Sequence, residues 1–495
     1  MRTEGAAESR LSRGDAALAL VLAVGCALLF RATAQARFAN DGPVLATLFV
    51  TEPEAVHWQV LYLPAARALA KVVVWGDVFE PLRVLNALGA GIGVAASFLL
   101  ARGLGVAGRQ ALAAAVLLAV SPCVWFFGTS VEVHALHFGM VGACACGTLF
   151  APWRRPMLAG AVSALLLALT YLTHGTAPLM GLGWVLLAAC GRARVAAPFL
   201  PRTLFLVVGP AFLGVLMLVV WSVKSWWSAA FDEPPTLELD LIRGYAEHTS
   251  SAAFLWTGLL KPLALLAPVV VVGLVVLGRS RAARDRRVAI ACAAAIAPPL
   301  VFLTWWGVPE RGGYLLGLAP FLAVLATAAF GRPSRGSLFV VAGLVLLQAA
   351  VAWTGKRGFD ASFDPADRVE LVHEHLADGG VLGTIGYLAP DISIWLPEVE
   401  EVDLVRRNPD DELDSIQEGW EADVPAADLA RSMKAIIEQA RSRGAVALDV
   451  SYRDGEWSLA GEEFLEYVIA FEQALLSHYT TRIVRRGSWT LILME

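Results

Sequence analysis

The sequence predicts a polytopic α-helical membrane protein, with about eleven transmembrane helices, that also carries a separate C-terminal α/β domain. Two observations support this prediction. Of the 495 residues, 57% are hydrophobic and only 17% are charged, whereas soluble domains carry roughly a quarter charged residues. The charges are also unevenly divided, because residues 1–354 hold 26 basic and 16 acidic residues and residues 355–495 hold 13 and 28. We therefore expect a membrane domain at 1–354 and a soluble acidic domain at 355–495.

Eleven apolar runs approach the roughly 20 residues that a helix needs to cross a bilayer. The loops between them alternate in arginine content, and arginine-rich loops stay on the cytoplasmic side of a membrane. This pattern predicts a bacterial cytoplasmic (inner) membrane protein with a cytoplasmic N-terminus and, after an odd number of crossings, a periplasmic C-terminal domain. The runs are residues 15–33, 82–101, 110–127, 131–150, 157–173, 176–190, 203–223, 252–278, 288–306, 313–330 and 337–354.

A further apolar stretch, residues 56–75, is expected to lie along the outer membrane surface instead of crossing it. Arg67 and Lys71 are one helical turn apart in this stretch and share a polar face. If the stretch crossed the membrane, every later arginine-rich loop would move to the outside, against the rule that places such loops in the cytoplasm.

The C-terminal part alternates between helical and strand patterns, which predicts an α/β domain. Its glycines between residues 379 and 386 lack the spacing of a dinucleotide-binding fingerprint. No nucleotide or redox cofactor is therefore expected. Helices are predicted near 369–376, 426–441 and 462–478, and strands near 381–387, 445–450 and 489–494.

Ionisable residues of the membrane part gather on its predicted outer face. Such residues are costly near a bilayer unless they face a wet cavity or one another, so a converging set predicts a functional site. We expect a cavity that opens outward. The set comprises Asp41, Glu52, Glu54 and His57 in the first outer loop, Glu132, His134 and His137 at the fourth run, His174 after the fifth, and Glu310 and Arg311 before the tenth.

The acidic members of this set also have structural interpretations that the sequence leaves open. Asp41 could cap a short helix that begins near Pro43. Thr129 and Glu132 have the spacing of a capping box at the start of the fourth run. Neither interpretation excludes a functional one, because a carboxylate at a helix N-terminus can also meet a substrate.

The basic members have structural alternatives as well. His134 and His137 lie three residues apart on one helix face and could bind a metal ion, and His174 could be a hydrogen-bonded turn residue. Arg311 could anchor the interface or pair with Glu310, or its guanidinium could hold a phosphate group.

Several short motifs occur in a recognisable order along residues 15–330. Together they resemble the GT-C superfamily of lipid-linked-sugar glycosyltransferases, and most of all its bacterial branch that is similar to protein O-mannosyltransferases. The motifs are Asp41, His57-Trp58-Gln59-Val60-Leu61-Tyr62, Arg83-Val84-Leu85-Asn86, Ser130-Val131-Glu132-Val133-His134-Ala135-Leu136-His137, Leu172-Thr173-His174 and Arg311-Gly312-Gly313-Tyr314-Leu315-Leu316-Gly317-Leu318-Ala319-Pro320.

The resemblance implies a GT-C-like membrane domain and a glycosyltransferase that uses a polyprenyl-phosphate-linked sugar donor. The sugar would pass to a protein or glycan acceptor at the outer face of the membrane, with Asp41 as the base and Glu132 as a second catalytic residue. No metal ligand is assigned and no nucleic acid partner is expected, although a divalent metal near Asp41 is left open. The implied substrate-binding residues are His57, Arg83, His134, His174, Glu310 and Arg311.

Two other classes of function also place polar residues at the mouth of a helix bundle. A lipid or solute transporter would do so, but transporters often show inverted repeats and interrupted spans, which are not evident here. A non-catalytic membrane scaffold with an outer domain is the third class. Loss of Asp41 would not affect such a scaffold.

Overall fold

The chain forms two compact units, each described here by itself. In the computed structural model the first comprises Met1–Ala34 and Pro53–Lys356, and the second comprises Gln35–Glu52 and Arg357–Glu495. The structure describes residues 11–35, 42–51, 60–72, 78–194, 292–301, 313–329, 342–343, 345–354, 365–376, 379–385, 392, 396, 398–404, 416–421, 423–450, 461–486 and 489–494. The predicted runs 203–223 and 252–278 lie outside these residues.

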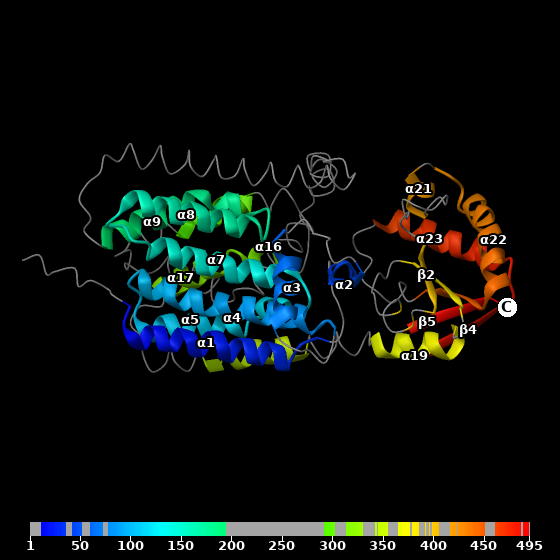
Figure 1. Ribbon diagram of the computed structural model, residues 1–495, viewed down its shortest axis with the longest axis horizontal. Coiled ribbons are helices and arrows are strands. Elements are labelled where there is room, and N and C mark those ends of the chain that lie inside the picture. The colour runs from blue at the N-terminus through cyan, green and yellow to red at the C-terminus, as the bar shows by residue number, and fades with distance from the viewer. Residues whose placement is uncertain are drawn as a thin grey trace, which may run out of the picture. The chain divides into compact units, whose positions relative to one another are not determined.

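The first unit is a bundle of apolar helices whose long axes are roughly aligned in Figure 1. Helix α4 lies at its centre and packs along both α1 and α7. The unit's described helices include α1 (Arg13–Ala32), α3 (Tyr62–Val72), α4 (Glu80–Gly103), α5 (Gly108–Ala119), α6 (Pro122–Thr129), α7 (Val133–Leu149), α8 (Pro156–Tyr171), the 3-10 helix η1 (Ala177–Met180), α9 (Gly181–Arg194), α16 (Gly313–Leu316) and α17 (Ala319–Ala329), with shorter apolar helices at Cys292–Val301 and Val345–Thr354.

The predicted span with the sharpest described break is 110–127. The run 110–127 was expected to cross as one helix, but the chain bends by 59° between α5 and α6. Pro122 lies in the first turn of α6, and the Ser121 side chain caps that helix by accepting from the Val124 backbone N–H. Proline has no backbone N–H and is best tolerated at a helix start, so the sequence begins a new helix here.

Within the described part of the chain, α1 and α4 are each long and apolar enough to cross a membrane, and α5 with α6 would add a third span if the bent pair crosses as one. The segment 56–75, which was expected to lie at the membrane surface, contains the short helix α3. The total of about eleven spans stays a prediction.

Glycines allow α4 and α7 to approach each other closely. A Cβ atom on Gly139 of α7 would lie 2.5 Å from the backbone oxygen of Gly89 in α4, and one on Gly89 would lie 2.6 Å from the oxygen of Ala135. One on Gly93 would meet the Phe138 ring at 2.4 Å. Backbone therefore packs directly against backbone, as small residues permit in membrane helices.

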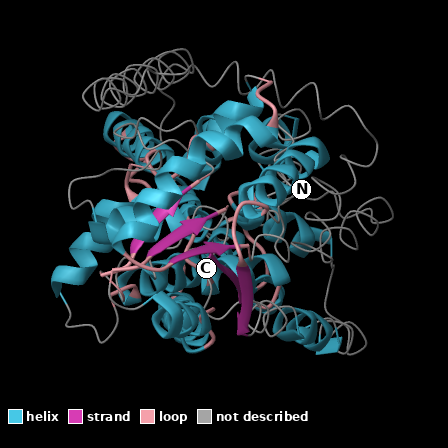
Figure 2. Ribbon diagram, turned by 90° about the vertical axis from the view of Figure 1, so that its right-hand side faces the viewer, coloured by secondary structure: helices cyan, strands magenta, loops and turns pink. Residues whose placement is uncertain are grey.

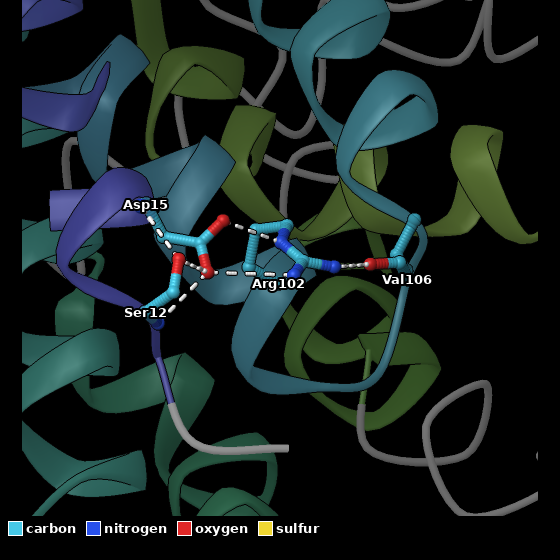
Figure 3. A network of polar contacts seen from close by, with 4 residues as sticks. All are labelled: Ser12, Asp15, Arg102 and Val106. Carbon is cyan, nitrogen blue, oxygen red and sulfur yellow. Dashed lines mark hydrogen bonds and ion pairs between the residues drawn. The ribbon is translucent and has the colours of Figure 1, made fainter. Parts of the chain in front are cut away.

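Ion pairs join α1 to α4 near both ends of α1. Close to its start, the Arg102 Nε atom lies 2.8 Å from Asp15 Oδ1, while Arg102 Nη1 donates to the Val106 oxygen at 2.6 Å (Figure 3). Ser12 and Asp15 form a capping box at the same point. Near the other end, Arg31 pairs with Glu80. These contacts fix the register of α1 against α4.

The second unit contains one five-stranded sheet (magenta in Figure 2) in the order β2-β1-β3-β5-β4. Strands β2, β1 and β3 run parallel, and β5 and β4 join them antiparallel. Helices α22 and α23 cover one face and α19 covers the other (Figure 1). The elements are α2 (Gly42–Thr51), α19 (Pro365–Leu376), β1 (Val381–Thr384), β2 (Glu400–Asp403), α21 (Ile416–Glu421), α22 (Ala426–Arg443), β3 (Val446–Asp449), α23 (Gly461–Leu476), β4 (Thr481–Arg486) and β5 (Trp489–Met494).

Strands β2 and β4 were not predicted from the sequence. Both lie at the edges of the sheet and are rich in charged residues, with the sequences EEVD and TRIVRR. Only the inner strands show the continuous apolar pattern of a strand buried on both faces. Charged residues on edge strands discourage pairing with other chains. They also interrupt the apolar pattern from which strands are predicted.

A buried arginine ties three elements of this unit together. Arg368 of α19 is fully buried, and its Nε and Nη2 atoms lie 2.9 Å from Asp449 Oδ2 and 2.8 Å from Glu401 Oε1. Its guanidinium also lies 5.4 Å from the Trp489 ring centre. A buried cation is tolerated here because two carboxylates and an aromatic face replace its water.

Replacing Gly139 by alanine is expected to weaken the packing of α4 against α7. The added Cβ atom overlaps backbone that cannot move aside, so we expect a loss of about 1–3 kcal/mol of stability. Gly160→Ala in α8 is the matched control, because nothing lies within 4 Å of its Cβ position. The measurement is the melting temperature in detergent. Equal melting temperatures for the two variants would contradict the close packing.

Arg368→Met is expected to destabilise the second unit by about 3–5 kcal/mol, since it removes the buried cation that the Asp449 and Glu401 carboxylates face. Arg431→Met is the control. Arg431 pairs with Asp428 at 3.0 Å, but the two side chains are 70% and 52% exposed, so its loss should cost less than about 1 kcal/mol. Pulse proteolysis of the full-length chain in urea, followed on the C-terminal fragment, measures both. A similar urea midpoint for both variants would show that the buried contacts of Arg368 do not stabilise the second unit.

Candidate functional site

Buried polar side chains converge where α7 begins. Glu132, His134 and His174 are each at least nine-tenths buried, and they come from the start of α7 and from the turn after α8. His137, from the same set of sequence candidates, is also buried, with its ring centre 4.9 Å from that of His174. Buried polar groups need partners, so such a cluster identifies a candidate site.

Glu132 is the N-cap residue of α7. Its Oε1 atom accepts from the Val133 backbone N–H at 3.0 Å and lies 3.8 Å from Nε2 of His134. The carboxyl group thus faces the positive end of the helix. The predicted capping box of Thr129 and Glu132 at the start of α7 is wrong. Thr129 belongs to the end of α6, where its hydroxyl donates to the Trp125 oxygen at 2.7 Å. Glu132 accordingly caps α7 by itself.

Three aromatic rings surround His134. Its ring centre lies 5.2 Å from both His174 and Tyr314 and 5.0 Å from Phe127. Tyr314 in turn lies 5.0 Å from His174. A Cβ atom on Gly313 would lie 2.3 Å from the His134 ring, so the glycine beside Tyr314 lets α16 approach α7.

Asn86 connects α4 to the residues before α7. Its side-chain oxygen accepts from the Tyr62 hydroxyl at 3.0 Å, and its amide donates to the Ser130 backbone oxygen. The Tyr62 hydroxyl also faces the backbone of Glu132. Burial and the nearby Glu132 charge raise the pKa of Tyr62 well above its ordinary value, so the phenol keeps its proton and acts as a hydrogen-bond donor.

A backbone hydrogen bond joins the start of α3 to the end of α8 beside the cluster. The Leu61 backbone N–H donates to the Leu172 oxygen at 3.0 Å. His174 lies in the turn after α8, and its Nδ1 atom is 2.9 Å from the Thr176 hydroxyl. His174 is therefore a hydrogen-bonded turn residue, as the structural interpretation predicted, and it also lies in the cluster.

Of the remaining sequence candidates, the structure describes Arg83. Arg83 is half-buried in the first turns of α4, one helical turn before Asn86. Four others, Asp41, His57, Glu310 and Arg311, lie outside the described residues.

Tyr62, Asn86 and Tyr314 belong to the site but were not singled out from the sequence. All three stand inside the motifs that carried the resemblance. A buried polar side chain in an apolar helix was the available signal, most clearly for Asn86, which is fully buried.

The cluster offers hydrogen-bonding groups suited to a polar ligand with hydroxyl groups. A carboxyl group, imidazoles, a phenol and an amide supply both donors and acceptors over a short distance. Within the described ranges, no three His, Cys, Asp or Glu side chains lie close enough together to hold a metal ion. A metal near Asp41 stays a prediction, since that residue is not described.

The fold of the chain is similar to that of ArnT. Crystal structures of ArnT from Cupriavidus metallidurans bound to undecaprenyl phosphate and in the apo state match it with TM-scores of 0.60 and 0.59 and sequence identities of 13% and 15%. The matches cover 98% and 97% of this chain and 98% of each ArnT chain. No family model and no curated protein sequence matches. The chain thus shares the fold of ArnT, whereas membership of the GT-C superfamily and of its mannosyltransferase-like branch stays a prediction.

Asn86→Leu is expected to destabilise the protein by about 1–3 kcal/mol, because it leaves the Tyr62 hydroxyl and the Ser130 oxygen without a buried partner. Ser97→Ala is the control, since the Ser97 hydroxyl is equally buried in α4 but donates only to Gly93 of its own helix. The melting temperature in detergent should fall for Asn86→Leu and stay nearly constant for Ser97→Ala. The reverse order would mean that Asn86 does not organise the cluster.

Proposed function

We propose that the protein transfers a sugar from a polyprenyl-phosphate-linked donor to a protein or glycan acceptor at the outer face of a bacterial inner membrane. The observation that carries the proposal is the convergence of buried hydrogen-bonding side chains at the start of α7, in a chain with the fold of a glycosyltransferase that has been crystallised with undecaprenyl phosphate. Polar residues inside an apolar bundle are costly and are retained for function.

The chemistry assigned to the site is nucleophilic substitution at the sugar. The acceptor hydroxyl attacks the anomeric carbon, the bond from that carbon to the phosphate oxygen breaks, and the polyprenyl phosphate leaves. The acceptor proton passes to a carboxylate, a step that typically contributes about 100- to 10,000-fold to the rate. We assign this base to Asp41 on the sequence motif.

The other roles divide between the sugar and the phosphate. Glu132, His134 and His174 form the side of the site that orients the sugar or the acceptor. Arginine suits the leaving phosphate because its planar group offers several donors, and we assign this role to Arg311 and, second, to Arg83. His57 and Glu310 complete the proposed substrate-binding set, and the motifs favour the mannosyltransferase-like branch of the fold.

The test incubates purified protein with radiolabelled undecaprenyl-phosphate sugars and a periplasmic extract, and follows whether label leaves the lipid fraction. Asp41→Asn should reduce transfer by at least about 100-fold while the melting temperature stays unchanged. Glu54→Gln, an acid of the same loop, is the matched control and should retain transfer. Normal transfer by Asp41→Asn would exclude it as the base, and no release by the wild type from any donor would contradict the function.

A further inference from the structure

One ring nitrogen of His137 is left with an open hydrogen-bonding role. His137 lies one turn after His134 in α7 and its side chain is 0% exposed. Its Nδ1 atom lies 2.9 Å from the Thr173 hydroxyl. Its Nε2 atom has no hydrogen-bond partner within the part of the chain that the structure describes. Leaving a buried polar atom in this condition is costly, so a hydrogen-bonding partner at Nε2 is favoured.

The neighbouring hydroxyl determines which nitrogen of His137 carries the hydrogen. Thr173 Oγ1 donates to the Thr170 backbone oxygen at 2.6 Å. A hydroxyl has one hydrogen, so Thr173 must accept from Nδ1 of His137. Burial disfavours a charged ring, and the neutral imidazole then has its hydrogen on Nδ1. Nε2 of His137 is therefore a hydrogen-bond acceptor.

The adjacent histidine has the opposite arrangement. The Thr176 backbone N–H donates to Nδ1 of His174 at 3.2 Å, so the hydrogen of the neutral His174 ring lies on Nε2. The ring centres of His137 and His174 are 4.9 Å apart. An acceptor nitrogen and an N–H donor thus stand on neighbouring rings. A hydroxyl group can donate to the acceptor nitrogen of His137, whereas a carboxylate, a fully ionised phosphate or an apolar group cannot.

We propose that Nε2 of His137 accepts a hydrogen bond from a hydroxyl group of the substrate, which makes His137 a specificity-determining residue of the site. The inference rests on the proposed function and extends it to a residue that the sequence motifs did not assign. The hydroxyl belongs either to the sugar of the lipid-linked donor or to the acceptor. A site built around a buried acceptor discriminates against a substrate that lacks the matching hydroxyl.

Two variants separate the roles of the two ring nitrogens. The amide of His137→Asn reaches the position of Nδ1 and can keep the bond to Thr173, but it removes Nε2. The amide of His137→Gln reaches the position of Nε2 and gives up the bond to Thr173. If Nε2 contacts a substrate hydroxyl, the Gln variant still distinguishes the substrate from an analogue that lacks this hydroxyl, and the Asn variant no longer does. Thr173→Val serves as the structural control, because it removes only the hydroxyl that orients the ring.

The experiment measures binding of undecaprenyl-phosphate hexoses, and of monodeoxy analogues of the hexose that binds best, to the purified full-length chain without acceptor. We expect one analogue to bind the wild type and His137→Gln at least about tenfold more weakly than the parent, equivalent to about 1.4 kcal/mol. His137→Asn should bind the two alike. If donor binding is unaffected but the KM for acceptor rises in His137→Asn only, the acceptor supplies the hydroxyl and the inference also holds.

Two results would overturn the inference. In the first, His137→Asn still binds the monodeoxy analogue more weakly than the parent hexose, whereas Thr173→Val binds the two alike. That result would mean that His137 acts only through Thr173. In the second, all analogues bind every variant alike and transfer is unchanged, which would leave only a water molecule at Nε2. The proposed function is judged separately, because donor binding without release of sugar contradicts transfer and not the hydrogen bond, whereas no donor binding contradicts both.

Discussion

A carboxyl group buried at the start of α7 is the constraint on which the membrane unit depends. Glu132 is fully buried, and a buried carboxyl group is tolerated only when hydrogen bonds replace its water. The helix end supplies a hydrogen bond from the Val133 N–H, the Nε2 atom of His134 lies 3.8 Å from the carboxyl group, and the Tyr62 hydroxyl faces the backbone of Glu132. Each partner must be held in position by its own element. The packing of α3, α4 and α7 therefore serves the polar cluster as well as the apolar core.

The close approach of α4 and α7 makes this arrangement possible. Gly89 and Gly139 bring the two backbones together, and Asn86, less than one turn before Gly89, then reaches the Ser130 oxygen and the Tyr62 hydroxyl. The contacts of Asp15 with Arg102 and of Arg31 with Glu80 hold α1 along the opposite side of α4. Rigid helices joined in this way can present a polar site with little reorganisation, which is what electrostatic stabilisation of a reacting substrate requires.

The apolar helices of the first unit could be predicted from the sequence, because apolar periodicity is a local signal, and the polar residues Glu132, His134 and His174 were noticeable in those runs for the same reason. The extent of the C-terminal domain and the roles of these residues stay predictions. The break at Pro122 was missed because the apolar run continues through it. Strands β2 and β4 were missed because edge strands lack an apolar pattern. Asn86 and Tyr62 were missed for another reason. They are 24 residues apart in sequence, and only the packing of α3 on α4 brings them into contact.

The most direct test of the central claim, that the start of α7 forms the substrate side of the site, is a cryo-electron microscopy structure of the full-length chain in lipid nanodiscs with undecaprenyl-phosphate mannose. Our account predicts density for the sugar against Glu132, His134, His137 and His174, with the polyprenyl chain leaving between helices. Sugar density elsewhere in the bundle, with this cluster closed off by side chains, would contradict it.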